Sequence, residues 1–232
     1  MLSRSSTADE RRSAAMGEAK PCAGSGSGTG GEEPWLAAHA DPARLFVAGD
    51  STGGNIAHNV AMRAGRSGLP GGARIEGMAL LHPYFRGGEL LPSERAEPRS
   101  LERAERWWAF VCAGRYGIDH PFVNPLAMPA AGWASLGCRR ALVAVAGRDK
   151  MRDRGRRYVE ALRASAWGGD EAALHEDRAE RHVFFLRRSD ASDKAKEDMI
   201  AAVASFIAAS SSSAEAGPGP SARPAGPSDA KL

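Results

Sequence analysis

Three residues, Ser51, Asp149 and His182, have the side-chain types and the order along the chain that acyl-transfer chemistry requires. A serine hydroxyl becomes an effective nucleophile only when a base takes its proton, and a carboxylate must orient that base. The order serine, acid, histidine is one of the known orders for such a trio. We therefore consider these residues as candidate nucleophile, orienting acid and general base.

Ser51 lies in the pentad Gly-Asp-Ser-Thr-Gly, residues 49–53, after an apolar run and before a helical pattern. The pentad's glycines leave space for a tight turn that would hold the serine in a strained, exposed position. The helix that follows would aim its N-terminal dipole at the serine, and the backbone N–H of Thr52 is the candidate oxyanion donor. The pentad alone is a weak signal, because turns of glycine and serine are common, but its flanks strengthen it.

The candidate acid is Asp149, which follows the apolar run 141–146 at the predicted C-terminal end of a strand. A carboxylate in a loop at that position can face the serine. Asp153 is the competitor, but it falls inside the next helical pattern and is interpreted as a helix-start or surface residue.

Among the six histidines, His182 is the candidate base because it follows the last predicted strand and precedes the last predicted helix. His175 falls within a strand pattern, His58 lies on the helix after the pentad, and His82 precedes a proline. These three are interpreted as structural, which is the more common role of a lone histidine.

Short apolar runs that end at turn residues predict strands at 45–48, 75–81 and 141–146, with a weaker one at 172–176. Apolar residues at helical spacing predict helices between and after them, over 56–64, 101–111, 158–166 and 195–206. Strands that alternate with helices indicate βαβ units. The expected fold class is α/β, with a mostly parallel sheet flanked by helices and its chemistry at the C-terminal ends of the strands.

The composition of the 232-residue chain divides it into three parts. Residues 1–33 and 210–232 are low-complexity and too poor in large apolar residues to form a core, so we expect them to be disordered. Residues 34–209 form the expected folded domain. The start of the chain is rich in Ser and Arg like a transit peptide, but Asp9 and Glu10 count against that interpretation. Without an apolar leader or a membrane-length apolar run, we expect no membrane association and a cytoplasmic location.

Charge and cysteine usage exclude several classes of site. The formal charge of +3 is small and evenly spread, so we expect no nucleic-acid partner. The three cysteines, Cys22, Cys112 and Cys138, lack the CxxC spacing typical of zinc sites and do not form a disulfide pattern. No metal and no cofactor is expected, and the expected partner is a small molecule.

Five stretches, taken together and in order, resemble the plant carboxylesterases of the α/β-hydrolase fold-3 group, which is related to hormone-sensitive lipase. They are GDSTGGNIAHNVAMRAG, IEGMALLHPYF, DHPFVNPLA, GRDKMRDRGRRYVEAL and HVFFL, and the resemblance spans about residues 34–208. It implies an α/β-hydrolase that cleaves small carboxylic esters, with Ser51, Asp149 and His182 as its triad. In the gibberellin receptors of this fold an apolar residue replaces the histidine, and isoflavanone dehydratases commonly carry threonine at the serine position.

The sequence departs from this family upstream of Ser51. Members carry a His-Gly-Gly-Gly loop that completes the oxyanion hole, together with the early strands of an eight-stranded sheet. The glycine cluster at 24–31 lacks the histidine and is interpreted as a linker. We therefore expect a partial domain, truncated at its N-terminus, with an exposed strand edge and impaired esterase activity. The alternative is a non-catalytic, receptor-like binding protein of the same fold.

Overall fold

The structure is a computed structural model that describes residues 34–97, 99–187 and 192–209. The segments 1–33 and 210–232, including Cys22 and the glycine cluster at 24–31, lie outside the described residues. The chain divides into a short unit, Met1–Ala40, and a large unit, Asp41–Leu232. Helix α2 (Pro34–His39) belongs to the short unit, and every other element described below belongs to the large one.

Four parallel strands form the sheet of the large unit, in the order β1-β2-β3-β4. Their bounds are β1 Leu45–Asp50, β2 Ile75–Leu81, β3 Cys138–Ala146 and β4 Glu171–Asp177. The parallel α/β fold class and all four predicted strands are confirmed. β1 is an outer strand of this described sheet and Leu45 on it is exposed, so the expected exposed strand edge is present.

The predicted helices are also present, each displaced or extended by a few residues. Their bounds are α3 Thr52–Ser67, α4 Ser100–Val111, α5 Arg152–Arg163 and α6 Asp193–Ala209. Short 3-10 helices occur at η1 Pro70–Gly72, η2 Pro92–Glu94, η3 Pro125–Ala127, η4 Ala130–Ser135 and η5 Phe184–Leu186. None of the helices in the described ranges combines the length and the apolar character needed to cross a bilayer.

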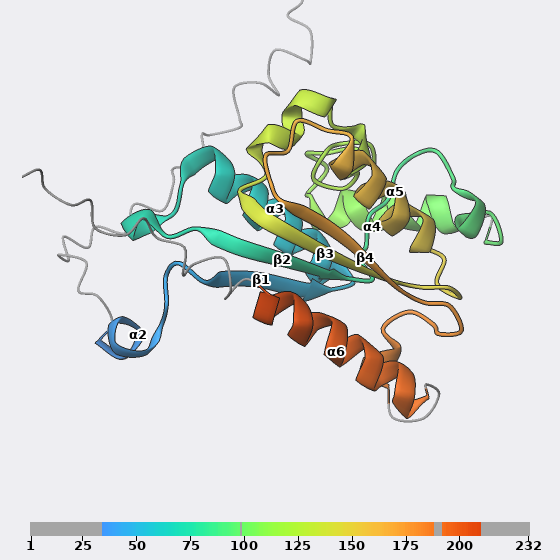
Figure 1. The fold of residues 1–232 in the computed structure, drawn as a ribbon. Helices are drawn as coiled ribbons and strands as arrows, with labels where there is room; N and C mark the ends of the chain where they lie inside the picture. Colours follow the sequence, from blue (N-terminus) through green and yellow to red (C-terminus); the bar gives the residue numbers. More distant parts are fainter. Residues whose placement is uncertain (1–33, 98, 188–191, 210–232) are drawn as a thin grey trace, which may run out of the picture. The chain divides into compact units, whose positions relative to one another are not determined.

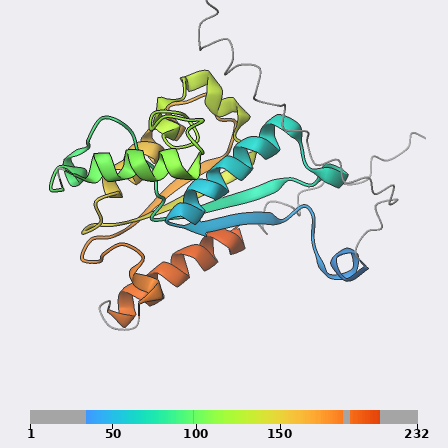
Figure 2. The same ribbon diagram turned by 180° about the vertical axis from the view of Figure 1, so that it is seen from behind.

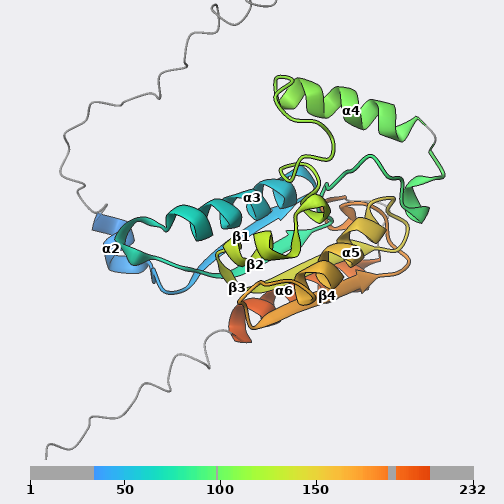
Figure 3. The same ribbon diagram turned by 90° about the horizontal axis from the view of Figure 1, so that it is seen from above.

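The sheet is covered on both faces, with α3 and α5 on one side and α6 on the other (Figures 1 and 2). Residues 141–146 of strand β3 are all apolar because alternate residues enter opposite cores. On one face, α3 and α5 pack on Ala141, Val143 and Val145. On the other face, α6 packs on Leu142, Ala144 and Ala146. Figure 3 shows α4 lying apart from these helices, on the side toward which the strands point.

Of the apolar stripe that its sequence suggested, Ile56, Val60 and Ala64, helix α3 buries only Ala64. Ile56 and Val60 are 62% and 44% exposed, whereas the small residues Ala57 and Ala61 are buried. The reason is a close approach: a Cβ added at Gly54 would lie 3.0 Å from the Cα of Pro83. The helix thus packs through the face on which small side chains let the backbones come near each other.

Candidate active site

Ser51 occupies a strained turn between β1 and α3, as predicted. Its φ of 51° and ψ of −116° lie in a region that L-residues rarely adopt. Its backbone N–H donates to the carbonyl of Leu81 (2.9 Å), and its own carbonyl accepts from the N–H of Tyr84 (2.8 Å) and of Gly54 (3.1 Å). Hydrogen bonds from the neighbouring strand end and from the helix therefore hold the serine in this conformation.

The two outer glycines of the pentad meet different surroundings. A Cβ at Gly49 would overlap the carbonyl oxygen of Gly53 and lie 2.8 Å from the nitrogen of Gly54. A Cβ at Gly53 would meet nothing within 4 Å. The chain folds back so tightly on Gly49 that only glycine fits there, whereas the described residues place no such demand on Gly53.

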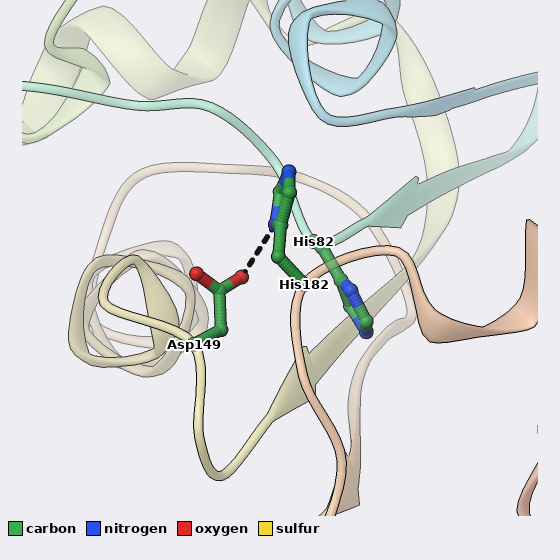
Figure 4. Close-up of side chains that lie close together, drawn as sticks. All are labelled: His82, Asp149 and His182. Atoms are coloured by element: carbon green, nitrogen blue, oxygen red, sulfur yellow. Dashed lines mark hydrogen bonds and ion pairs between the residues drawn. The ribbon is translucent and has the colours of Figure 1, made fainter. Parts of the chain in front are cut away.

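The structure brings Ser51, Asp149 and His182 together. The Nε2 atom of His182 lies 3.0 Å from the Oγ of Ser51, and its Nδ1 lies 2.7 Å from the Oδ2 of Asp149 (Figure 4 shows the second contact). The other oxygen of the buried Asp149 carboxylate accepts from the backbone N–H of Met151 (3.0 Å). With Nδ1 donating to the carboxylate, Nε2 presents a lone pair to the serine hydroxyl, which is the tautomer that a general base needs.

Parallel strands explain how residues far apart in the sequence converge. Ser51 follows the end of β1, Asp149 follows the end of β3, and His182 follows β4 after a short turn. The carboxyl ends of parallel strands all meet at one edge of the sheet. Asp50, the last residue of β1, pairs with Leu81 at the end of β2, so the strands end nearly level.

The backbone N–H of Thr52 has no hydrogen-bond acceptor among the described residues. Thr52 is the first residue of α3, where a helix leaves its N–H groups without intrahelical partners. The positive end of the helix dipole lies there as well. This N–H is thus available to a negatively charged oxygen next to Ser51.

His82 contacts the segment that carries His182, which the sequence did not indicate. It is buried, and its Nδ1 accepts from the backbone N–H of Val183 at 2.8 Å. Val183 adopts a left-handed conformation (φ 52°, ψ 39°), which is unusual for a β-branched residue and needs support from its surroundings. Burial lowers the pKa of His82 to about 4, so near neutral pH its ring is uncharged and Nδ1 can accept this bond. His82 directly follows β2, and this position at the C-terminal end of a parallel strand is the sequence signal that could have indicated its role.

His82 forms, with Asp149 and His182 of the candidate triad, a cluster that could hold a metal ion (Figure 4). One ligand atom from each lies within 4.8 Å of the others. However, the lone pair on Nδ1 of His82 is engaged by Val183, so its Nε2 carries the proton, and Nδ1 of His182 donates to Asp149. Metal ligation needs a free lone pair on each nitrogen. These hydrogen bonds fit proton transfer better than metal binding.

The alternative residues weighed from the sequence have contacts elsewhere. Asp153 lies in the first turn of α5, where it accepts from the N–H of Ser93 and pairs with Arg156. His58 is buried against the hydroxyl of Tyr158 (2.9 Å). His175, in β4, contacts Asp177 (2.9 Å).

Known proteins share sequence with about three quarters of this chain. Residues 18–186 match the alpha/beta hydrolase fold family. The chain is 42% identical over 177 residues to 2-hydroxyisoflavanone dehydratase of Glycyrrhiza echinata, covering 75% of this chain and 53% of the relative. It is 42% identical over 175 residues to the chloroplastic tuliposide A-converting enzyme 2 of Tulipa gesneriana, covering 75% and 44%. It is 37% identical over 175 residues to probable carboxylesterase 2 of Arabidopsis thaliana, covering 75% and 54%.

The chain thus spans about half the length of the curated relatives that it matches. Among solved structures, a thermostable esterase from Pseudomonas putida superposes with a TM-score of 0.58 at 24% identity, covering 75% of this chain and 55% of that one. Fungal esterases from Rhizomucor miehei give a TM-score of 0.56 at 24% identity, with coverage of 75% and 52%. At this identity the superpositions show a shared fold.

Proposed function

Because this chain belongs to the alpha/beta hydrolase fold family, we propose that it is a serine carboxylesterase in which Ser51, Asp149 and His182 form the catalytic triad. The observation that carries the proposal is the position of His182, within hydrogen-bonding distance of both the hydroxyl of Ser51 (3.0 Å) and the carboxylate of Asp149 (2.7 Å). The 37% identity to probable carboxylesterase 2 of Arabidopsis thaliana supports it.

In the proposed mechanism, Nε2 of His182 takes the hydroxyl proton as the Oγ of Ser51 attacks the ester carbonyl. The carboxylate of Asp149 keeps Nδ1 protonated and stabilises the imidazolium that forms. The backbone N–H of Thr52 donates to the developing oxyanion. His182 then gives its proton to the leaving alcohol, which leaves an acyl group on Ser51. Water, deprotonated by His182, attacks this acyl group and releases the carboxylic acid.

The residue types favour hydrolysis over the other activities of similar proteins. A histidine stands at position 182, where the receptor-like members have an apolar residue, and a serine stands at position 51, where dehydratases commonly have threonine. One feature favours the non-catalytic alternative: the 232-residue sequence carries no His-Gly-Gly-Gly motif, and thus no loop of that kind to add an oxyanion donor to the N–H of Thr52. Loss of one such donor typically lowers the rate by about 10²- to 10³-fold, so we expect slow turnover.

The test compares the 232-residue chain with its Ser51→Ala and Ser67→Ala variants. Ser67 is an exposed serine at the C-terminal end of α3, the helix that follows Ser51, and serves as a matched control. We expect hydrolysis of p-nitrophenyl acetate and butyrate, and labelling by a fluorophosphonate probe, to be lost in Ser51→Ala and kept in Ser67→Ala. Labelling that persists in Ser51→Ala would refute the nucleophile. A folded chain with neither labelling nor turnover would support the binding protein instead.

A further inference from the structure

A cavity of about 390 Å³ is lined by residues between the end of β2 and α4 and by Lys150, which follows Asp149 of the proposed triad. Two of its lining residues adjoin triad residues through the backbone: the N–H of Tyr84 donates to the carbonyl of Ser51 (2.8 Å), and Lys150 follows Asp149 in the chain. The opposite wall comes from α4, through Arg103 and Trp107. A group of a substrate bound at Ser51 can therefore extend into this cavity.

The inner wall of the cavity carries a buried positive charge. Arg86 lines the cavity and pairs with Glu94 at 2.6 Å. The same carboxylate also accepts from Arg154, at 2.8 and 2.9 Å, so one negative charge serves two guanidinium groups. The Nε atom of Arg86 is buried and has no hydrogen-bond acceptor among the described residues. A buried cation with an unpaired donor indicates a place for an additional acceptor.

The outer wall repeats this imbalance of charge. Lys150 and Arg103 both line the cavity, and both pair with the carboxylate of Glu97, at 2.9 and 2.8 Å. The hydrogen bond and charge of Lys150 lower the pKa of Glu97, so this carboxylate is ionised near neutral pH. The three cations that line the cavity, together with Arg154 behind it, thus share the two carboxylates Glu94 and Glu97, so this group of side chains carries a net positive charge.

Aromatic side chains complete the walls. Tyr84 stacks on Trp108 with ring centroids 5.9 Å apart, which fixes one side of the cavity. Trp107 lines it from α4 and is 51% exposed, so its ring is available for contact. A flat, unsaturated or aromatic group could pack on these rings while an anionic substituent meets the cations.

We propose that this cavity is a substrate subsite that selects carboxylic esters bearing a second, anionic group, a carboxylate several bonds from the ester carbonyl. The inference rests on the proposed esterase activity and specifies its substrate class. The carboxylate can belong to the acyl part or to the alcohol part of the ester, because both are bonded to the carbon that Ser51 attacks.

The test measures kcat/KM for two pairs of esters and uses the ratio within each pair. For an anion on the acyl side, the pair is mono-p-nitrophenyl adipate and p-nitrophenyl hexanoate. For an anion on the alcohol side, it is 4-carboxyphenyl butyrate and 4-carbamoylphenyl butyrate. The ratio of kcat/KM for the anionic ester to that for the neutral ester cancels effects that a variant has on both esters alike. The pair whose ratio changes shows whether the subsite binds the acyl side or the alcohol side.

Three variants make the expectation directional. Arg103→Gln removes a cation and is expected to lower the ratio by roughly fivefold, the size typical of a partly exposed charge pair. Glu97→Gln removes the carboxylate that competes for Arg103 and Lys150, and is expected to raise the ratio by a similar factor. Arg106→Gln, an exposed arginine of the same helix that does not line the cavity, should leave it unchanged. Ratios that stay constant in the first two variants for both pairs would overturn the proposal.

Failure of the esterase activity can be told apart from failure of the subsite. If no ester shows turnover that depends on Ser51, binding of mono-phenyl adipate and phenyl hexanoate to the Ser51→Ala chain is measured by isothermal titration calorimetry. The subsite predicts tighter binding of the anionic compound, weakened by Arg103→Gln and by salt, since screening reduces the attraction. Equal binding of the two compounds would refute the subsite.

Discussion

The Gly49→Ala substitution is expected to unfold or deform the serine turn, because an alanine Cβ there overlaps the backbone of Gly53 and Gly54. Its neighbours are backbone atoms of the first helical turn, which cannot rotate away as a flexible side chain can. Overpacking in a well-packed site typically costs about 1–3 kcal/mol and occasionally more. We expect at least about 3 kcal/mol, which for a chain of this size lowers Tm by roughly 6–12 °C.

The matched control is Gly53→Ala in the same pentad. Its Cβ meets no atom within 4 Å, and Gly53 lies inside α3 with no positive φ. Alanine in a helix is favoured over glycine by about 0.5–1 kcal/mol, so this variant should keep or slightly raise Tm. Both variants would be followed by circular dichroism during heating and by fluorophosphonate labelling of Ser51. If Gly49→Ala melts and labels like the wild type, or both variants lose stability equally, the steric reasoning fails.

Two further predictions concern buried histidines. His82→Phe keeps a ring but removes the acceptor for the N–H of Val183, so kcat should fall about tenfold with a smaller change in KM. His82→Gln should recover part of this loss. An unchanged kcat in a folded His82→Phe variant would show that the contact does not position His182. Burial, and secondarily the charge of Arg66, lower the pKa of His58 to about 3, below its ordinary 6.5. The unfolded chain therefore binds the proton first, and His58 by itself should lower the free energy of unfolding by about 1.4 kcal/mol per pH unit below pH 6.5, in addition to the contribution of His82. Urea unfolding at pH 7 and 5 checks this, and a His58→Phe variant with the same pH slope would contradict it.

The strands and helices could be predicted because their signals are local. Apolar runs ending at turn residues placed β2 at its observed bounds, and helical spacing found α6 within a few residues. The helix start at Asp153 and the loop position of Asp149 are also local features, and they distinguished the two carboxylates. Spacing alone failed for α3, since the face that a helix buries depends on how closely its neighbours approach. That approach is set by Gly54 against Pro83, residues that only the fold brings together.

The sequence by itself determined the α/β architecture, the serine turn, and the three residue types whose chain order fits a nucleophile, an acid and a base. These depend on periodicity and on strand ends, which residues near one another in the chain define. Only the tertiary structure decided the distances from His182 to Ser51 and Asp149. It also decided that Gly49 but not Gly53 lacks space for a Cβ, that His82 supports Val183, and that cations share carboxylates at the cavity. Each of these depends on an atomic distance between backbone or side-chain groups, which the turn or the packing of strands and helices sets, and residue spacing carries no such distance.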